Sequence, residues 1–297
     1  MKKNKLMYLI VLPAVIFVLV FNYAPMFGIV IAFQDYKILE GVSGSEWVGF
    51  KAFRDMFFLA NTSTYRLLRN TLYISIIRIL TNFPLILLFA LLIREIKNRA
   101  GRSAIQTVAY IPYFISWVAV SGIAYNLFSA DEGLINKMLV AFGGKPVSWY
   151  TEEEPWWWIL ALSSLWKGMG WSTLIYMSAM GSIDGELYDA CLIDGGGRWQ
   201  QAMVVTFPGI ANVIAMQVLM DAASVLSDNA DQILAMTNGS ASLGNTDVIG
   251  SSMIANITGG GSFAQATALG LVQGVVGLIM VFIVNSVVKK TENEGIL

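Results

Sequence analysis

Residues 189–208 read DACLIDGGGRWQQAMVVTFP, a polar stretch with three consecutive glycines between two long apolar segments. Ahead of it, apolar residues from Ile183 to Cys191 recur at helical spacing. Gly195–Gly197 can supply the positive φ that ends such a helix, and Trp199 begins a second apolar face. The pattern predicts a short helix, a turn and a second helix, which lie on one face of the membrane if the flanking segments cross it.

The composition indicates that they do. Of 297 residues, 56% are hydrophobic and 13% are charged, and the mean hydropathy is +0.62. A soluble domain carries about 25% charged residues, and several windows here exceed the roughly 20 apolar residues that span hydrocarbon. The chain is therefore predicted to be an all-α polytopic membrane protein.

Composition also excludes several kinds of chemistry. The net charge of −1 excludes the basic surface of a nucleic-acid-binding protein. The single cysteine, Cys191, excludes an internal disulfide framework, and the absence of histidine excludes imidazole catalysis and histidine-bound metals. We expect no catalytic residues and no metal site.

Six membrane spans are predicted within one transmembrane domain that covers residues 1–297. In the first, Pro13, Asn22 and Pro25 interrupt an apolar stretch longer than the core of a signal peptide, which predicts a retained, kinked helix. The spans cover about residues 6–33, 67–93, 103–128, 156–180, 208–226 and 264–288.

The distribution of basic residues predicts the orientation, because short cytoplasmic loops are enriched in Lys and Arg. With the N-terminus inside, both termini and the 181–208 loop are cytoplasmic. The basic residues then on the cytoplasmic side are Lys2, Lys3, Lys5, Arg94, Lys97, Arg99, Arg102, Arg198, Lys289 and Lys290.

Two outer segments show ordered patterns. Residues 47–59 have the apolar spacing of an amphipathic interfacial helix. Trp149, Tyr150 and the tryptophans at 156–158 lie where an aromatic belt anchors the fourth span, and a sugar platform is the alternative.

Residues 189–208 resemble the "EAA" loop of bacterial ABC importer permeases, whose form is roughly E-A-A-x-x-D-G-A followed by L-P about a dozen residues later. Ala190, Asp194, Gly195 and Pro208 match it position by position, whereas Asp189 and Cys191 replace the usual Glu and Ala, and Gly195-Gly196 the usual Gly-Ala. The wider resemblance is to carbohydrate permeases of the maltose-permease superfamily, in the branch that imports complex oligosaccharides and polysaccharide fragments. It rests on LP at 12–13, NYAPM at 22–26, FQDY at 33–36, IPYFISW at 111–117, YNLF at 125–128 and LWKGMGW at 165–171.

This resemblance implies a type I importer fold in the bacterial inner membrane, with a second related permease, two cytoplasmic ATPase subunits and an extracytoplasmic substrate-binding protein. The chain has no Walker A pattern, so ATP and Mg belong to the ATPase partner and this chain needs no cofactor. The loop is expected to insert into a groove of the ATPase. Its expected coupling residues are Glu186, Asp189, Ala190, Asp194, Gly195 and Arg198.

Polar residues within the spans are candidates for a carbohydrate path, because polar side chains are costly in hydrocarbon and sugars need hydrogen-bonding groups and aromatic faces. Ion pairing of Arg78 or Lys167 with Asp221 is the equally weighted alternative. The candidates are Arg78, Trp166, Lys167, Trp171, Gln217, Asp221, Asn229, Asp231 and Gln232, with Tyr176 as a further aromatic.

Other classes of protein remain open at this stage. An ion-coupled secondary transporter would also contain several spans and buried charges, but it would more often show inverted repeats and broken helices in matching halves. A membrane-embedded enzyme would have only carboxylates to work with, and a channel is the least favoured class.

Overall fold

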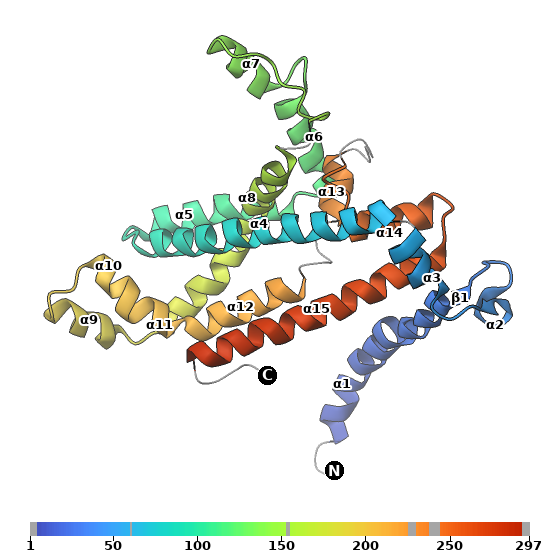
Figure 1. The fold of residues 1–297 in the computed structure, drawn as a ribbon. Helices are drawn as coiled ribbons and strands as arrows, with labels where there is room; N and C mark the ends of the chain where they lie inside the picture. The colour runs from blue at the N-terminus through green and yellow to red at the C-terminus, as the bar shows by residue number, and fades with distance from the viewer. Residues whose placement is uncertain (1–4, 60, 153–154, 225–229, 238–243, 293–297) are drawn as a thin grey trace. The chain divides into compact units, whose positions relative to one another are not determined.

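The computed structural model describes residues 5–59, 61–152, 155–224, 230–237 and 244–292, and nearly all of these are helical or in turns (Figure 1). The chain forms two compact units. One comprises residues 1–65 and 252–272, and the other comprises residues 66–251 and 273–297. The prediction of a single transmembrane domain stays a prediction.

The first unit combines an apolar helix with a small two-stranded sheet. Its core consists of small alanines, among them Ala32 and Ala268, which allow Phe33 and Phe53 to pack closely. The elements are α1 (Lys5–Val18), η2 (Leu19–Tyr23), η3 (Ala24–Phe33), β1 (Gln34–Asp35), α2 (Gly41–Gly44), β2 (Glu46–Trp47), α3 (Lys51–Arg54) and η4 (Asp55–Leu59), with the start of α4 (Asn61–Arg94), most of α14 (Ile249–Thr258) and the start of α15 (Phe263–Glu292).

The first predicted span is helical but irregular. The α-helix changes at Leu19 to a π-helical turn and at Ala24 to a 3₁₀ helix, in which Pro25 occupies the first turn. A proline is tolerated there because its missing N–H would have no partner within the helix. Of the three residues from which a kink is predicted, Asn22 and Pro25 lie in these altered segments, whereas Pro13 lies inside α1.

The helix predicted over residues 47–59 begins four residues later than expected. Trp47 belongs to β2 and pairs with Gln34 of β1 in an antiparallel register. Gly49 then turns the chain with φ +61°, and the helical segment starts at Lys51. The apolar spacing of Trp47 and Val48 arises from a strand and a turn, which periodicity alone does not distinguish from a helix end.

The second unit contains the remaining helices, and α4, α5, α6, α12 and α13 pack against α8. α8 joins two apolar clusters, one around Trp156 and Leu160 and the other around Tyr176 and Met180. The elements are the rest of α4, α5 (Arg99–Tyr110), η5 (Ile111–Phe114), α6 (Trp117–Phe128), α7 (Leu134–Ala141), α8 (Trp156–Gly181), α9 (Gly185–Ile193), α10 (Arg198–Gln201), η6 (Ala202–Thr206), α11 (Phe207–Gly209), α12 (Ala211–Ala223), α13 (Ala230–Met236) and the rest of α15.

Among the described residues, three helical segments are long and apolar enough to cross a membrane, and up to five are if each of two bent pairs is counted as one span. The three cover residues Tyr8–Phe33, Thr64–Arg94 and Phe263–Ser286. α8 has 26 residues, but its tryptophans, serines and Lys167 make it less apolar. The number of six membrane spans therefore stays a prediction.

Two predicted spans are bent. Residues Arg99–Phe114 and Trp117–Phe128 meet at 100°, and residues Arg198–Gly209 and Ala211–Ala223 meet at 66°. At the first bend Ser116 is extended, and its hydroxyl accepts a hydrogen bond from the N–H of Ala119, so a new helix starts there. At the second, Pro208 lies in α11 and α12 begins at Ala211, which corrects the predicted start of the fifth span at residue 208.

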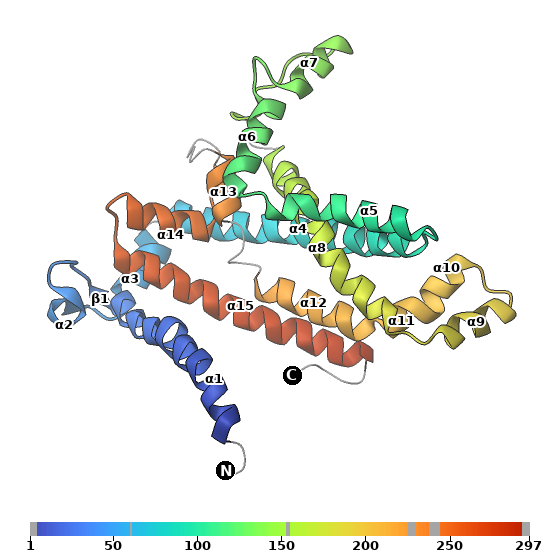
Figure 2. The same ribbon diagram turned by 180° about the vertical axis from the view of Figure 1, so that it is seen from behind.

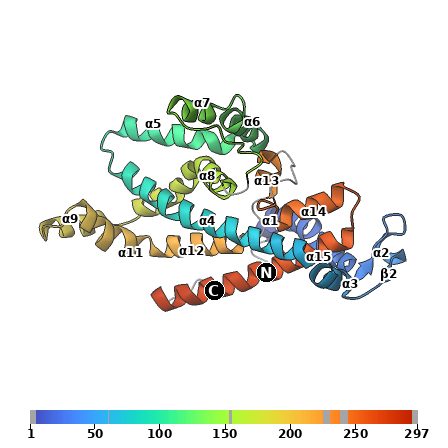
Figure 3. The ribbon, with the colours of Figure 1, turned by 45° about the horizontal axis from the view of Figure 1, so that its top comes forward.

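Within the second unit, α9 and α10 form a hairpin at the end of α8 and α11 (Figure 1; Figure 2 shows the same from behind). In Figure 3 this hairpin and α13 lie at opposite ends of the unit. The predicted helix, turn and second helix are therefore present. They lie far from α13, which carries the polar candidates Asp231 and Gln232.

Candidate functional site

The α9–α10 hairpin (residues 184–206) begins with a side-chain cap. Asp184 is extended, and its carboxylate accepts a hydrogen bond of 3.0 Å from the N–H of Glu186. A carboxylate at this position satisfies one of the free N–H groups and interacts favourably with the helix dipole. Local sequence therefore fixes where α9 starts.

Glycine ends the same helix. Gly195 has φ +79°, and its N–H donates to the carbonyl of Leu192, while the N–H of Gly196 donates to the carbonyl of Cys191 at 2.8 Å. This reversal in the left-handed region costs other residues about 1–2 kcal/mol. The turn between α9 and α10 thus depends on Gly195 for its backbone conformation.

Gly196 has a different reason to be glycine. A Cβ at this position would lie 2.5 Å from Sγ of Cys191 and 2.7 Å from its carbonyl oxygen. The usual pattern of the EAA loop has alanine at the positions of both Cys191 and Gly196. In this chain a larger side chain at 191 is therefore accompanied by a smaller residue at 196. The two departures from the pattern are in contact, and each offsets part of the volume change of the other.

The hairpin exposes apolar side chains. None of the nine residues of α9, all of which the structure describes, is buried, and Ile193 is 86% exposed. Leu187, Leu192 and Trp199 are also more than half exposed. An exposed apolar patch rimmed by carboxylates is typical of a surface that docks another protein.

The predicted coupling residues lie on this surface. Glu186, Asp189, Ala190, Asp194 and Gly195 are exposed, and Arg198 is exposed in an ion pair of 3.0 Å with Glu95 at the end of α4. Sequence reasoning missed three residues that hold the hairpin, which are Arg94, Tyr188 and Thr206. In the sequence Arg94 is marked only by its charge, and no local pattern connects residues so far apart in the chain.

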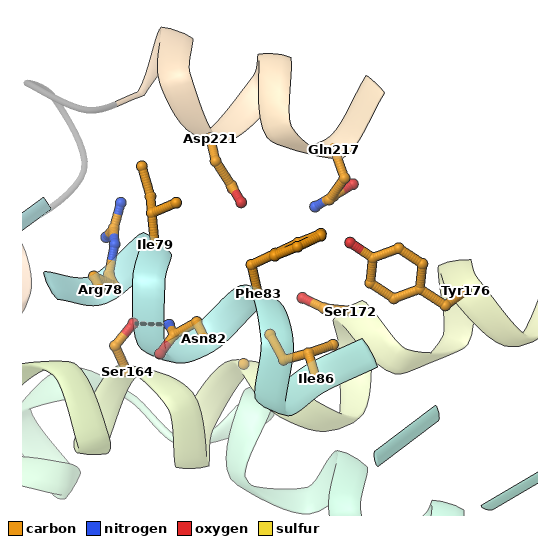
Figure 4. A pocket seen from close by; sticks show the side chains of 11 residues that line it. Arg78, Ile79, Asn82, Phe83, Ile86, Ser164, Ser172, Tyr176, Gln217 and Asp221 are labelled. Atoms are coloured by element: carbon orange, nitrogen blue, oxygen red, sulfur yellow. Dashed lines mark hydrogen bonds between the residues drawn. The ribbon is translucent and has the colours of Figure 1, made fainter. Parts of the chain in front are cut away.

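A second candidate site is a polar cavity of about 140 Å³ between α4, α8 and α12 (Figure 4). Arg78 lines it from α4, Tyr176 from α8, and Gln217 and Asp221 from α12, so four of the predicted path residues come together here. The other polar residues of the lining are Asn82, Ser164 and Ser172.

The cavity has polar walls supplied by three helices. In Figure 4 the side chains of Gln217 and Asp221 extend from α12 toward those from α4, and the hydroxyl of Tyr176 points to the same space. Asn82 donates a hydrogen bond of 3.3 Å to the hydroxyl of Ser164 and links α4 to α8. Donors and acceptors are therefore presented together, as recognition of a polyhydroxylated molecule requires.

The other candidates on α8 lie beside the bend between η5 and α6. The ammonium of Lys167 donates a hydrogen bond of 2.7 Å to the carbonyl of Tyr113 and lies 5.5 Å from the centroids of the Tyr113 and Trp117 rings. Trp171 stacks on Tyr113 with a centroid distance of 4.8 Å. Lys167 therefore satisfies a carbonyl that the bend leaves without a helical partner, and Trp166 is partly exposed on the same helix.

The last candidates lie on or before α13. Gln232 is buried, and its amide donates to the carbonyl of Leu160 at 2.7 Å and to the hydroxyl of Ser163 at 2.9 Å. Asp231 is exposed, and Asn229 lies outside the described residues. Gln232 thus connects α13 to α8.

Comparison with known proteins places this fold and this hairpin in a family. The model of the family described as "Binding-protein-dependent transport system inner membrane component" matches residues 82–292. Protein LplB of Bacillus subtilis (strain 168) is 34% identical over 296 residues, which are 100% of this chain and 92% of that protein. The polygalacturonan/rhamnogalacturonan transport system permease protein YteP of the same organism is 37% identical over 297 residues, 99% of this chain and 91% of that protein.

Solved structures agree with these relatives. A chain of a bacterial ABC transporter involved in the import of the acidic polysaccharide alginate is 30% identical, with a TM-score of 0.88 over 98% of this chain and 97% of that one. The similarity confirms the predicted all-α, multi-pass fold of the type I importer permeases. The chain belongs to the binding-protein-dependent transport system inner membrane components, the permease subunits of ABC transporters, in which separate subunits hydrolyse ATP.

Proposed function

We propose that this chain is one of two permease subunits of an importer for oligosaccharides or polysaccharide fragments. The observation that supports this substrate class most is the similarity, over nearly the whole chain, to YteP and to the alginate transporter, whose names specify polygalacturonan, rhamnogalacturonan and alginate. Full-length similarity matters here because the substrate path of a permease is built from several spans rather than from one motif.

The partners in this proposal are a second, related permease, two copies of a cytoplasmic ATPase that hold ATP and Mg, and an extracytoplasmic binding protein. A structure of the alginate transporter includes a periplasmic protein with a bound alginate pentasaccharide, which supports the last of these. In the bacterial cell membrane, both termini and the hairpin face the cytoplasm. The segments on this side are rich in Lys and Arg, which are concentrated in cytoplasmic loops.

The α9–α10 hairpin docks the ATPase in this account. The exposed carboxylates of Glu186 and Asp189 offer charge to basic groups of the partner, and the exposed Leu192 and Ile193 offer apolar area. The capped start and the glycine turn give the hairpin one defined shape, so that movement of the ATPase displaces it as a unit.

The polar cavity forms part of the sugar path on this subunit. Arg78, Asn82, Gln217 and Asp221 carry both donors and acceptors, which sugar hydroxyls and carboxylates require. Trp166, Trp171, Lys167, Asn229, Asp231 and Gln232 stay candidates, with Lys167 and Gln232 engaged in bonds between helices.

The test is uptake by the reconstituted complex of labelled acidic and neutral oligosaccharides, delivered by the loaded binding protein. Gln217→Ala is compared with Met216→Ala, whose side chain is exposed on the neighbouring position of α12. We expect Gln217→Ala to change the rate or the preference among sugars, and Met216→Ala to change neither. Equal behaviour of the two variants would remove the cavity from the sugar path, and absence of uptake for every oligosaccharide would refute the substrate class.

A further inference from the structure

The cytoplasmic end of α4 is bonded to the α9–α10 hairpin through Arg94, the last residue of α4. Its guanidinium lies over the ring of Tyr188 at 4.3 Å and donates a hydrogen bond to the Tyr188 hydroxyl. The same nitrogen donates to Oγ1 of Thr206 at 3.3 Å, and the hydroxyls of Tyr188 and Thr206 are 3.0 Å apart. The three residues, termed the coupling clamp, therefore form a closed triangle between α4, α9 and η6.

Arginine is suited to this position for two physical reasons, and its partner Thr206 is held in place by burial. The planar cation of arginine stacks on an aromatic ring and donates in fixed directions at the same time, which an ammonium group does not. It also interacts favourably with the negative end of the α4 dipole. Thr206 is only 2% exposed, so its hydroxyl is held in a defined place.

The hairpin has few other attachments at this point. Arg94 and Tyr188 line a cavity of about 550 Å³ and also a second cavity of about 220 Å³, so side-chain packing is sparse around their contact. α9 buries none of its residues. The ion pair between Glu95 and Arg198 is exposed and contributes little. The coupling clamp is thus the main specific contact between this hairpin and the end of α4.

α4 in turn reaches the polar cavity. Arg78, which lines that cavity, lies 16 residues before Arg94 on one helix that continues through Pro84, a distance of roughly 24 Å at 1.5 Å per residue. A displacement of the hairpin that is transmitted to Arg94 is therefore transmitted to the wall of the cavity.

We propose that the coupling clamp makes the hairpin and α4 move as one body, so that Arg94, Tyr188 and Thr206 are positioning residues for the conversion of ATPase movement into transport. This inference rests on the proposed function. Without the clamp, the hairpin still docks the ATPase through its exposed face, but its displacement reaches α4 less completely. Such a change lowers the amount of sugar imported for each ATP hydrolysed.

The experiment uses the complete complex in proteoliposomes with the loaded binding protein. Tyr188→Phe keeps the ring beneath Arg94 and removes the hydroxyl, Thr206→Val keeps the shape and removes the other hydroxyl, and Arg94→Lys keeps only the charge. The matched control is Arg99→Gln, which removes an exposed cation on the same side. We measure sugar imported per ATP hydrolysed, together with the amount of ATPase that copurifies.

We expect each clamp variant to lower the ratio of sugar to ATP by roughly threefold to tenfold, the range that corresponds to the loss of about one hydrogen bond. The amount of ATPase that copurifies with each clamp variant should match the wild type. The ratio of sugar to ATP in the Arg99→Gln control should also match the wild type. Because the three residues act together, the Tyr188→Phe/Thr206→Val double variant should be little worse than the poorer single variant.

A distance measurement gives a readout that a purely structural role would not change. Spin labels at Leu92, which is exposed on α4, and at Gly185, where a side chain meets no atom within 4 Å, are introduced in a Cys191→Ala background. Between the ATP-free and ATP-trapped states, their separation should stay constant in the wild type and change in Tyr188→Phe.

The outcomes separate this inference from the proposed function. If the wild-type complex imports no sugar on ATP hydrolysis, the proposed function fails. If it does, and the clamp variants retain the wild-type ratio and a constant label separation, the clamp has no role in coupling. Loss of assembly in all three variants would assign these residues to structure alone and would also overturn the proposal.

Discussion

The backbone at Gly195 provides a stringent test of the hairpin, because the structure assigns it a conformation that other residues avoid. Gly195 has φ +79°, and open space surrounds the position of a Cβ. Gly195→Ser therefore introduces no clash and perturbs only the backbone preference. The cost of the left-handed conformation is about 1–2 kcal/mol, which corresponds to roughly a 5- to 30-fold change in the population of the native turn.

Gly197 supplies the matched control. It has φ −74° at the N-cap of α10, and a Cβ there also meets no atom within 4 Å. Serine is favoured at an N-cap, so Gly197→Ser should leave the turn unchanged. Gly195→Asn should fall between the two, because asparagine tolerates the left-handed region better than serine does.

The assay is stimulation of ATP hydrolysis by the loaded binding protein in the reconstituted complex. We expect Gly195→Ser to reduce stimulation at least fivefold while the complex still assembles, and Gly195→Pro, which also removes the N–H that donates to Leu192, to abolish it. If Gly195→Ser and Gly197→Ser behave alike, the turn geometry is not what positions the hairpin, and the reasoning fails.

Three further predictions follow from contacts elsewhere in the second unit. Gly196→Ala should destabilise the complex by about 1–3 kcal/mol in thermal unfolding. In the double variant, Cys191→Ala should restore part of that stability. If the two substitutions instead have additive effects, the two sites are independent. Gly170→Ala should be similarly destabilising, because its Cβ would lie 2.1 Å from the carbonyl of Ala109 on α5, whereas Gly168→Ala meets nothing and should be tolerated; equal melting temperatures would contradict this. Lys167→Met should lower stability by about 1 kcal/mol through the lost bond to Tyr113 and leave the preference among sugars unchanged, so a changed preference with unchanged stability would make Lys167 a substrate contact instead.

Much of the fold is predictable because hydrocarbon imposes long apolar helices. The segments around residues 8–33, 64–94 and 263–286 are such helices in the structure. The bend at Ser116 was not predicted, although its signals, Pro112 and a capping serine, are present in the sequence. Apolar composition continues across the bend, and composition therefore obscured a local change of direction.

The candidate sites show the same division between local and long-range information. Asp184 and Gly195 determine the ends of α9 through nearest neighbours, so the hairpin could be predicted from its own residues. The partners of Arg94 lie 94 and 112 residues away in the chain, and no periodicity indicates them. Gln232 was a path candidate by type, but only the fold shows that Leu160 and Ser163 engage its amide.

This chain, as proposed, moves a carbohydrate only when a partner subunit hydrolyses ATP. The most direct measurement is sugar uptake into proteoliposomes that contain the complete complex, with loaded binding protein outside and ATP either enclosed or omitted. We expect uptake only with enclosed ATP, and loss of uptake when the ATPase is inactivated. Uptake without ATP that follows an imposed ion gradient would contradict the account and would indicate an ion-coupled carrier.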